Sequence, residues 1–169
     1  RRIGVKLRGH SRFLYDLYDA LETSSDEQFF NVIGPDGIGL VDKIKFKEML
    51  TSSIDYTVRS GGEVRQRKRE KLLVIPQFVI GRNVLSPSQL SEGTFKTITL
   101  LFYLMTEKSS ALLIEEPEVC VHHGLLSSIV ELIKTYSKRK QIIISTHSDF
   151  VLDQVEPHQV YKVTRTAKL

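Results

Sequence analysis

The spacing of hydrophobic positions changes near residue 85. After that point, short and continuous apolar runs alternate with stretches of helical spacing, which predicts buried strands alternating with helices. The expected elements are a helix from about Gly93 to Thr106, a strand at Ala111–Ile114, a helix around Leu125–Tyr136, a strand at Ile142–Ile144, a short helix around Phe150–Val155 and a strand at Val160–Val163. Such a pattern is typical of an α/β domain whose parallel sheet is covered on both faces.

Before residue 85 the pattern is mixed. It predicts a helix capped by Ser11, a hairpin that joins Phe29–Ile33 to Ile38–Val41 through the turn Gly34–Gly37, a strand around Ile44 and Phe46, a turn at Ser60–Gly62 and a strand at Leu72–Ile80, where Pro76 requires an edge or a bulge. We therefore expect residues 1–85 to form a mixed α+β segment, part of an insertion or helical subdomain, and residues 86–169 to form an α/β lobe.

Composition narrows the class of protein. The 169 residues are 41% hydrophobic, which is enough for a core, and the longest apolar run, Ile98–Met105 broken only by Thr99, is too short to span a membrane. The single cysteine, Cys120, excludes an internal disulfide and favours a reducing, cytoplasmic setting. Because the chain begins with Arg1 rather than Met, we expect it to be part of a longer polypeptide.

The excess of positive charge lies entirely in the first 85 residues. These carry 15 Lys and Arg against 11 Asp and Glu, whereas the remaining residues carry 9 of each. The densest group consists of Arg65, Arg67, Lys68, Arg69 and Lys71. Such a group attracts the phosphate backbone of DNA or RNA, but it is equally typical of a solvated surface.

Three acidic residues follow the first buried strand, in the sequence Glu115-Glu116-Pro117-Glu118. Crowded carboxylates repel one another unless a cation lies among them, so this cluster favours a bound Mg²⁺, with one carboxylate at the metal and the next acting as a base toward water. A charged loop between strand and helix is the alternative.

Two further polar clusters accompany the acidic one. His147 follows the second buried strand, and it emerges beside Glu116 if the two strands are neighbours; the alternative is an ordinary loop histidine. Ser91-Glu92-Gly93-Thr94 stands at the start of the apolar helix, where free N–H groups favour an anion such as phosphate. The alternative for Ser91 or Thr94 is a plain helix cap.

In this order the motifs resemble the carboxyl-terminal half of ABC-type ATPases of the P-loop fold: the signature motif at 90–94, the Walker B segment at 112–118 and the switch-histidine loop at 145–148. The Glu-Glu-Pro-Glu and Thr-His-Ser forms look like the branch that contains RecF-like repair proteins, SMC-like proteins, overcoming-lysogenization-defect (OLD) ATPases and related phage-defence ATPases. Glu92 stands where the usual signature has its first glycine.

The resemblance implies a role for each matching residue. Glu115 corresponds to the metal-associated acid, Glu116 to the general base and His147 to the switch histidine. The signature residues Ser91, Glu92, Gly93 and Thr94 correspond to those that contact the nucleotide of an opposing head, and residues 118–122 correspond to the segment between two opposed sites. The implied cofactors are ATP and Mg²⁺, and the implied partner is a second ATPase head in a homodimer.

A Gly-x-x-x-x-Gly-Lys-Ser/Thr loop, which would cradle the phosphates, does not occur in these 169 residues. We therefore expect an ATPase in the full-length protein, coupled to DNA repair or anti-phage defence, and no activity from this chain alone. Two alternatives remain. One is a nucleic-acid-binding or scaffold subunit that uses nucleotide as a clamp, and the other is an ATPase that regulates a fused or partner nuclease.

Overall fold

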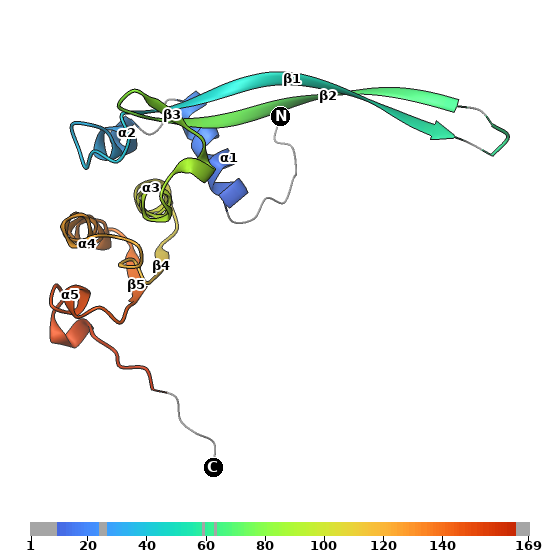
Figure 1. Ribbon diagram of the computed structural model, residues 1–169. Coiled ribbons are helices and arrows are strands. Elements are labelled where there is room, and N and C mark those ends of the chain that lie inside the picture. The colour runs from blue at the N-terminus through green and yellow to red at the C-terminus, as the bar shows by residue number, and fades with distance from the viewer. Residues whose placement is uncertain (1–9, 24–26, 59, 63, 165–169) are drawn as a thin grey trace, which may run out of the picture. The chain divides into compact units, whose positions relative to one another are not determined.

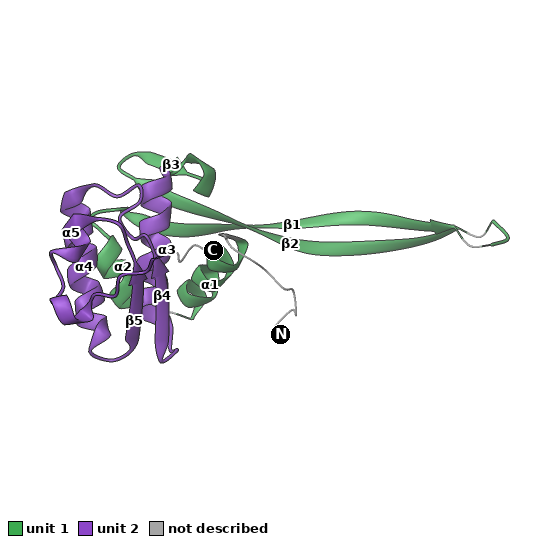
Figure 2. Ribbon diagram, turned by 90° about the horizontal axis from the view of Figure 1, so that it is seen from below, with its two compact units in different colours: residues 1–90 green, residues 91–169 purple. Residues whose placement is uncertain are grey.

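The computed structural model describes residues 10–23, 27–58, 60–62 and 64–164, which belong to two compact units, residues 1–90 and residues 91–169 (Figure 2). Each unit has its own sheet. The first contains three antiparallel strands in the order β1-β2-β3, and the second contains the parallel pair β4-β5.

The first unit begins with helix α1 (His10–Glu22). Its apolar residues Phe13, Leu17 and Ala20 recur at helical spacing and are buried, which confirms the predicted helix. The helix already includes Ser11, so this residue lies in the first turn and is not the cap that the sequence suggested. Tyr18 joins the helix to the first strand, because its ring packs edge-on against Phe46 with centroids 5.1 Å apart.

The hairpin predicted over residues 29–41 is wrong. Residues Glu27–Ile33 form helix α2, because Phe29 and Ile33 lie one helical turn apart and both are buried. The turn at Gly34–Gly37 ends this helix, and the amides of Gly34 and Ile38 donate to the carbonyls of Phe30 and Val32. The residues that follow, 38–41, form no strand.

Strands β1 (Lys43–Val58) and β2 (Val64–Ile80) form a long two-stranded ribbon, which we call the arm (Figure 1). The strands predicted here are confirmed, but they are much longer than expected, and Ser60–Gly62 forms the predicted turn. The third strand, β3 (Asn83–Leu85), pairs only with residues 78–80 of β2. At Pro76, β2 therefore has only β1 beside it, which confirms the predicted edge position. A 3₁₀ turn, η1 (Pro87–Gln89), follows β3.

The second unit contains α3 (Glu92–Thr106), β4 (Ala111–Glu115), α4 (His123–Ser137), β5 (Gln141–Ser145), α5 (Asp149–Leu152) and η2 (Pro157–Gln159). This order confirms the predicted helices and the two apolar strands. The buried residues of α4, which packs against β5, are Leu126, Ile129, Val130 and Ile133. Lys140 connects α3 to β5, because its ammonium group donates to the carbonyls of Leu104 and Glu107.

Two details of the predicted sheet are wrong. Val160–Val163 is not a strand, and its exposed fractions reach 94% at Val163; within the described residues β5 pairs only with β4, so no ladder is available to this segment. Among the described residues of the second unit, one face of the sheet is also left uncovered. Leu113 and Ile143 lie opposite each other on this face and are 76% and 51% exposed. Among the described residues, no helix is both long and apolar enough to cross a membrane.

Candidate functional site

The parallel pairing of β4 and β5 brings the predicted polar clusters together. The register runs from Ala111↔Gln141 to Glu115↔Ser145, so both strands end at the same row. The chain after Glu115 and the chain after Ser145 therefore leave the same edge of the sheet (Figure 2). This edge, at the carboxyl ends of parallel strands, is where α/β proteins bind their ligands.

Glu116, the predicted base, has an unusual backbone conformation. Its φ is +42°, in the left-handed region that costs a non-glycine residue about 1–2 kcal/mol. Two contacts hold this conformation: the Glu116 amide donates to the Ser145 carbonyl at 2.9 Å, and the Lys96 ammonium donates to the Glu116 carbonyl at 2.7 Å. The side chain remains 45% exposed, so its carboxylate is accessible to water.

His147 lies beside Glu116. Its Nδ1 is 3.3 Å from Oε1 of Glu116 and 3.7 Å from Oε1 of Glu118, and the ring is 73% exposed. The residues that the sequence assigned to catalysis, Glu116 and His147, are thus neighbours, although they are 31 positions apart in the chain. With Nδ1 directed at carboxylates, the second ring nitrogen, Nε2, is left for another partner.

Glu118 belongs to the acidic cluster of the sequence, but no catalytic, metal or nucleotide role was predicted for it. Its Oε1 accepts hydrogen bonds from the Thr146 hydroxyl at 2.7 Å and from the His147 amide at 3.2 Å, and only 10% of its side chain is exposed. Burial raises the pKa of Glu118, but these hydrogen bonds and the nearby His147 outweigh burial, so the pKa lies below its ordinary value. Glu118 therefore joins the loop after β4 to the loop after β5 as a carboxylate. The sequence signal for this contact is Thr146, whose hydroxyl stands directly before His147.

The signature residues begin helix α3. Ser91 is its N-cap and accepts a hydrogen bond from the Thr94 amide at 3.0 Å, while the hydroxyls of Ser91 and Thr94 lie 2.7 Å apart. Glu92 is exposed in the first turn. Gly93 is buried, and a Cβ at this position would lie 1.9 Å from the Cys120 carbonyl oxygen. The glycine therefore packs the helix start against the loop after β4, which leaves Ser91 and Thr94 as the polar groups at this end.

Glu115, the predicted metal ligand, is the last residue of β4 and is exposed. Among the described residues, no three His, Cys, Asp or Glu side chains are grouped so that they could hold a metal ion by themselves. Mg²⁺, however, usually binds one or two carboxylates together with waters and substrate phosphates. Glu115 and the buried Oε2 of Glu118, which has no hydrogen-bond partner, are carboxylate oxygens of the kind that this ion binds.

The basic residues belong to the first unit and lie on β2. Side chains alternate between the faces of a strand, and the register assigns paired residues to the same face. We call the face with Arg65, Arg67, Arg69 and Lys71 the basic face of the arm. Lys68 lies on the opposite face, where its ammonium is 3.0 Å from Glu70, so the sequence cluster is divided by the strand.

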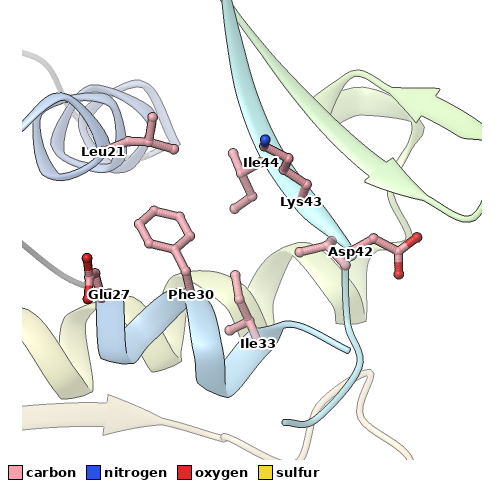
Figure 3. A pocket seen from close by; sticks show the side chains of 8 residues that line it. Leu21, Glu27, Phe30, Ile33, Asp42, Lys43 and Ile44 are labelled. Atoms are coloured by element: carbon pink, nitrogen blue, oxygen red, sulfur yellow. The ribbon is translucent and has the colours of Figure 1, made fainter. Parts of the chain in front are cut away.

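A cavity of about 290 Å³ also lies in the first unit (Figure 3). Leu21, Phe30, Ile33 and Ile44 supply apolar side chains to it, and none of the candidate site residues from the sequence lines it. It carries no grouping of polar side chains comparable to that at the ends of β4 and β5.

A family model described as "AAA domain, putative AbiEii toxin, Type IV TA system" matches residues 6–153. No curated protein matches the chain.

Several solved structures are similar to the chain. An Smc head bound to the C-winged helix domain of ScpA has a TM-score of 0.51 at 14% identity, over 86% of this chain and 41% of that one. A structure from work on ATP-driven dimerization and DNA stimulated activation of SMC ATPases has a TM-score of 0.49 at 15% identity, over 86% and 78%. An Smc head with a coiled coil and joint, from Pyrococcus yayanosii, has a TM-score of 0.45 at 14% identity, over 86% and 25%. The chain thus spans 41% of the ScpA-bound head.

Replacing Gly93 by alanine is expected to destabilise the chain by about 1–3 kcal/mol, because the new Cβ would overlap the backbone carbonyl of Cys120. Gly124→Ala is the matched control. Its Cβ would meet only the His122 ring at an ordinary 3.6 Å, and alanine is favoured over glycine in a helix. Urea unfolding followed by circular dichroism measures both changes. Equal stability of the two variants would contradict the close approach.

Replacing Glu118 by glutamine removes the charge but keeps an acceptor for Thr146 and His147, and we expect a loss of roughly 1 kcal/mol at pH 7. The folded-state pKa is lowered from 4.5, so the charge stabilises the fold above that pH and this contribution disappears as the pH falls through the folded-state pKa. The stability difference between wild type and Glu118→Gln should therefore shrink on acidification in urea titrations. Glu131→Gln, at a carboxylate that is 65% exposed, should show a smaller difference at pH 7.

Proposed function

Because the chain belongs to the family of AAA domains described as "putative AbiEii toxin, Type IV TA system", whose model covers residues 6–153, we propose that it forms one lobe of an ATPase head that hydrolyses ATP. One observation carries the proposal: His147 Nδ1 lies 3.3 Å from the Glu116 carboxylate, at the edge of the sheet where two parallel strands end. The fold is similar to that of the ScpA-bound Smc head.

Glu116 acts as the general base in this proposal. Its carboxylate is exposed enough to contact a water molecule, and its left-handed backbone is fixed from both sides, by Ser145 and by Lys96. Backbone strain of this kind is concentrated at functional sites, where it holds a side chain in place before the substrate arrives. Activating water by removing its proton contributes typically 10²–10⁴-fold to such reactions.

His147 positions the phosphate end of the nucleotide. Glu118 fixes the His147 backbone through its amide, and the carboxylates of Glu116 and Glu118 face Nδ1. With Nδ1 facing these carboxylates, Nε2 is the ring nitrogen that remains for a phosphate oxygen. In this arrangement the residue that touches nucleotide is His147, and Glu118 is a positioning residue.

The signature residues take part from the other side of a composite site. We assign the Ser91 and Thr94 hydroxyls and the free N–H groups of the α3 N-terminus to the phosphates of a nucleotide held by a second head. Gly93 maintains the packing of this helix end on the loop after β4. Glu115 would hold Mg²⁺, which when bound neutralises developing charge on the phosphates. The implied assembly is a dimer of heads around ATP.

The phosphate-binding loop is supplied by residues outside these 169, since the chain contains no Gly-x-x-x-x-Gly-Lys-Ser/Thr sequence. In this proposal the chain alone does not hydrolyse ATP, and the activity belongs to the full-length protein. The sequences Glu115–Glu118 and Thr146–Ser148 support a place in the RecF- and OLD-like branch, with a role in DNA repair or phage defence.

Glu116→Gln in the full-length protein is expected to retain ATP binding and to lose at least about 100-fold in hydrolysis, because the amide cannot take a proton from water. Filter binding of labelled ATP and release of phosphate measure the two properties. Glu131→Gln, on the exposed surface of α4, is the control and should leave turnover unchanged. Undiminished turnover by Glu116→Gln would refute the assignment.

A second function, binding of a nucleic-acid backbone, is favoured by the basic face of the arm. Between Thr51↔Lys71 and Thr57↔Arg65 this face has four cationic side chains, Arg65, Arg67, Arg69 and Lys71, against one acid, Asp55, which pairs with Arg69 at 2.8 Å. Successive side chains on one face of a strand are about 6.8 Å apart, so the four cover about 20 Å. The aromatic Tyr56 lies on the opposite face. We therefore propose contacts to phosphates without base stacking and without sequence preference.

The double variant Arg67→Gln/Lys71→Gln is expected to lower the slope of log K against log salt by about 1.8 for duplex DNA, because each lost phosphate contact removes about 0.9. Fluorescence anisotropy with a labelled duplex at several salt concentrations measures this slope. Lys68→Gln is the matched control, since Lys68 is a neighbour in sequence but lies on the opposite face. If Lys68→Gln lowers the slope by about 0.9, as each substitution in the double variant should, the basic face has no special role in binding.

A further inference from the structure

The face of the arm opposite the basic face is apolar. Along the outer part of the arm its rows are Leu50↔Leu72, Ser52↔Glu70, Ile54↔Lys68, Tyr56↔Gln66 and Val58↔Val64. Six of these side chains are large and apolar, and all are exposed: Leu50 73%, Ile54 48%, Tyr56 65%, Val58 69%, Val64 59% and Leu72 53%. We call these five rows the apolar face of the arm.

This exposure makes the arm an unusual element. A two-stranded ribbon alone is at best marginally stable in water, because it lacks a second layer on which to bury a face. Residues 47–58 and 64–73 of the arm are exposed throughout, so the described residues of the first unit supply no such layer to the ribbon beyond its base. Exposed apolar surface arranged contiguously, rather than scattered, marks an interaction site.

The order of the rows is nearly symmetric, and this symmetry points to the occupant. The outermost rows, Leu50↔Leu72 and Val58↔Val64, are both apolar, and Ile54↔Lys68 lies midway between them. A two-fold axis that runs across the arm through the middle row therefore places Leu50↔Leu72 on Val58↔Val64 of the other copy, and the middle row on its own copy. Two-fold interfaces require this self-complementarity, because the same surface patch is used by both copies.

Charge and area support the same occupant. The two charged residues of the apolar face, Lys68 and Glu70, neutralise each other at 3.0 Å, so the face attracts neither a polyanion nor an acidic peptide. The six apolar side chains are between 48% and 73% exposed, so two such faces offer an apolar area on the order of the 1,200 Å² at the lower bound for a specific and stable interface. Sheets that pack face to face lie about 10 Å apart, which the side chains of two ribbons fill.

We propose that the arms of two copies of this chain pack through their apolar faces to form a two-layered ribbon, with both basic faces directed outward. This association uses the first unit alone and needs no nucleotide. It is therefore separate from the ATP-dependent dimer of heads, and it can hold two copies together whether or not nucleotide is bound.

The first experiment is sedimentation velocity on the 169-residue chain without ATP or Mg²⁺ over a wide range of concentrations. Wild type is expected to sediment as a concentration-dependent dimer. Leu50→Glu, which places a charge in the apolar face, should raise the dimer dissociation constant at least about tenfold, since one buried charge costs more than 1.4 kcal/mol. The matched control is Thr51→Glu, on the basic face and opposite Lys71, which should leave the dimer unchanged. A wild-type chain that remains monomeric, or equal effects of the two variants, would overturn the proposal.

Cross-linking gives a second measurement that does not depend on a destabilising substitution. In a Cys120→Ser background, Ile54→Cys lies in the middle row, where a two-fold axis brings it near its own copy, whereas Ser53→Cys lies on the basic face. A short bis-maleimide should cross-link Ile54→Cys and leave Ser53→Cys monomeric. Equal cross-linking at both positions, or none at Ile54→Cys, argues against the packed arms. The test contains no nucleotide, so its failure would not contradict the ATPase proposal. In the same way, full turnover by Glu116→Gln would not contradict the packing of two arms.

Discussion

The arrangement of the second unit depends on the parallel register of β4 and β5. Pairing of Glu115 with Ser145 ends both strands in one row, and the Glu116 amide continues the contact by donating to the Ser145 carbonyl. A slip of one residue would turn every side chain to the other face of the strand and would separate Glu116 from His147. The alternation that buries Ile114 and exposes Leu113 therefore also decides which polar groups meet at the edge of the sheet.

Three residues, Glu118, Lys96 and Gly93, convert that shared edge into a defined site. Glu118 joins the loop after β4 to the loop after β5 through the Thr146 hydroxyl and the His147 amide. Lys96 joins α3 to the same loop through the Glu116 carbonyl, and Gly93 permits the start of α3 to lie directly against Cys120. Each contact fixes backbone rather than a flexible side-chain end. Three segments distant in sequence are thereby positioned around Glu116, at the cost of a left-handed φ at that residue.

The sequence was informative where the hydrophobic period was long and unbroken. The helical spacing of α3 and α4 and the apolar runs of β4 and β5 predicted these elements, and the polar residues after each strand predicted which side chains would share an edge. For short segments the predicted secondary structure was wrong. The pair Phe29-Phe30 is compatible with a strand or a helix. In the structure Phe29 and Ile33 are buried on the same side, one turn apart, and the segment is helix α2. Val160–Val163 has the composition of a strand, but composition supplies no partner for its ladder.

The arm shows why a run of charge is ambiguous until its secondary structure is known. On a helix, Arg65 to Lys71 would spread around the axis, whereas on a strand every second residue points the same way, so the run becomes a basic face that excludes Lys68. The same alternation collects Leu50, Ile54 and Tyr56 on the reverse side. The sequence alone did not reveal this face, because Ile54 and Tyr56 each stand between polar residues. The two faces of the arm are therefore stable under opposite conditions in water. Its charged face is stable when solvated, and its apolar face is stable only when covered, so the arm is directed toward an assembly by its own alternation.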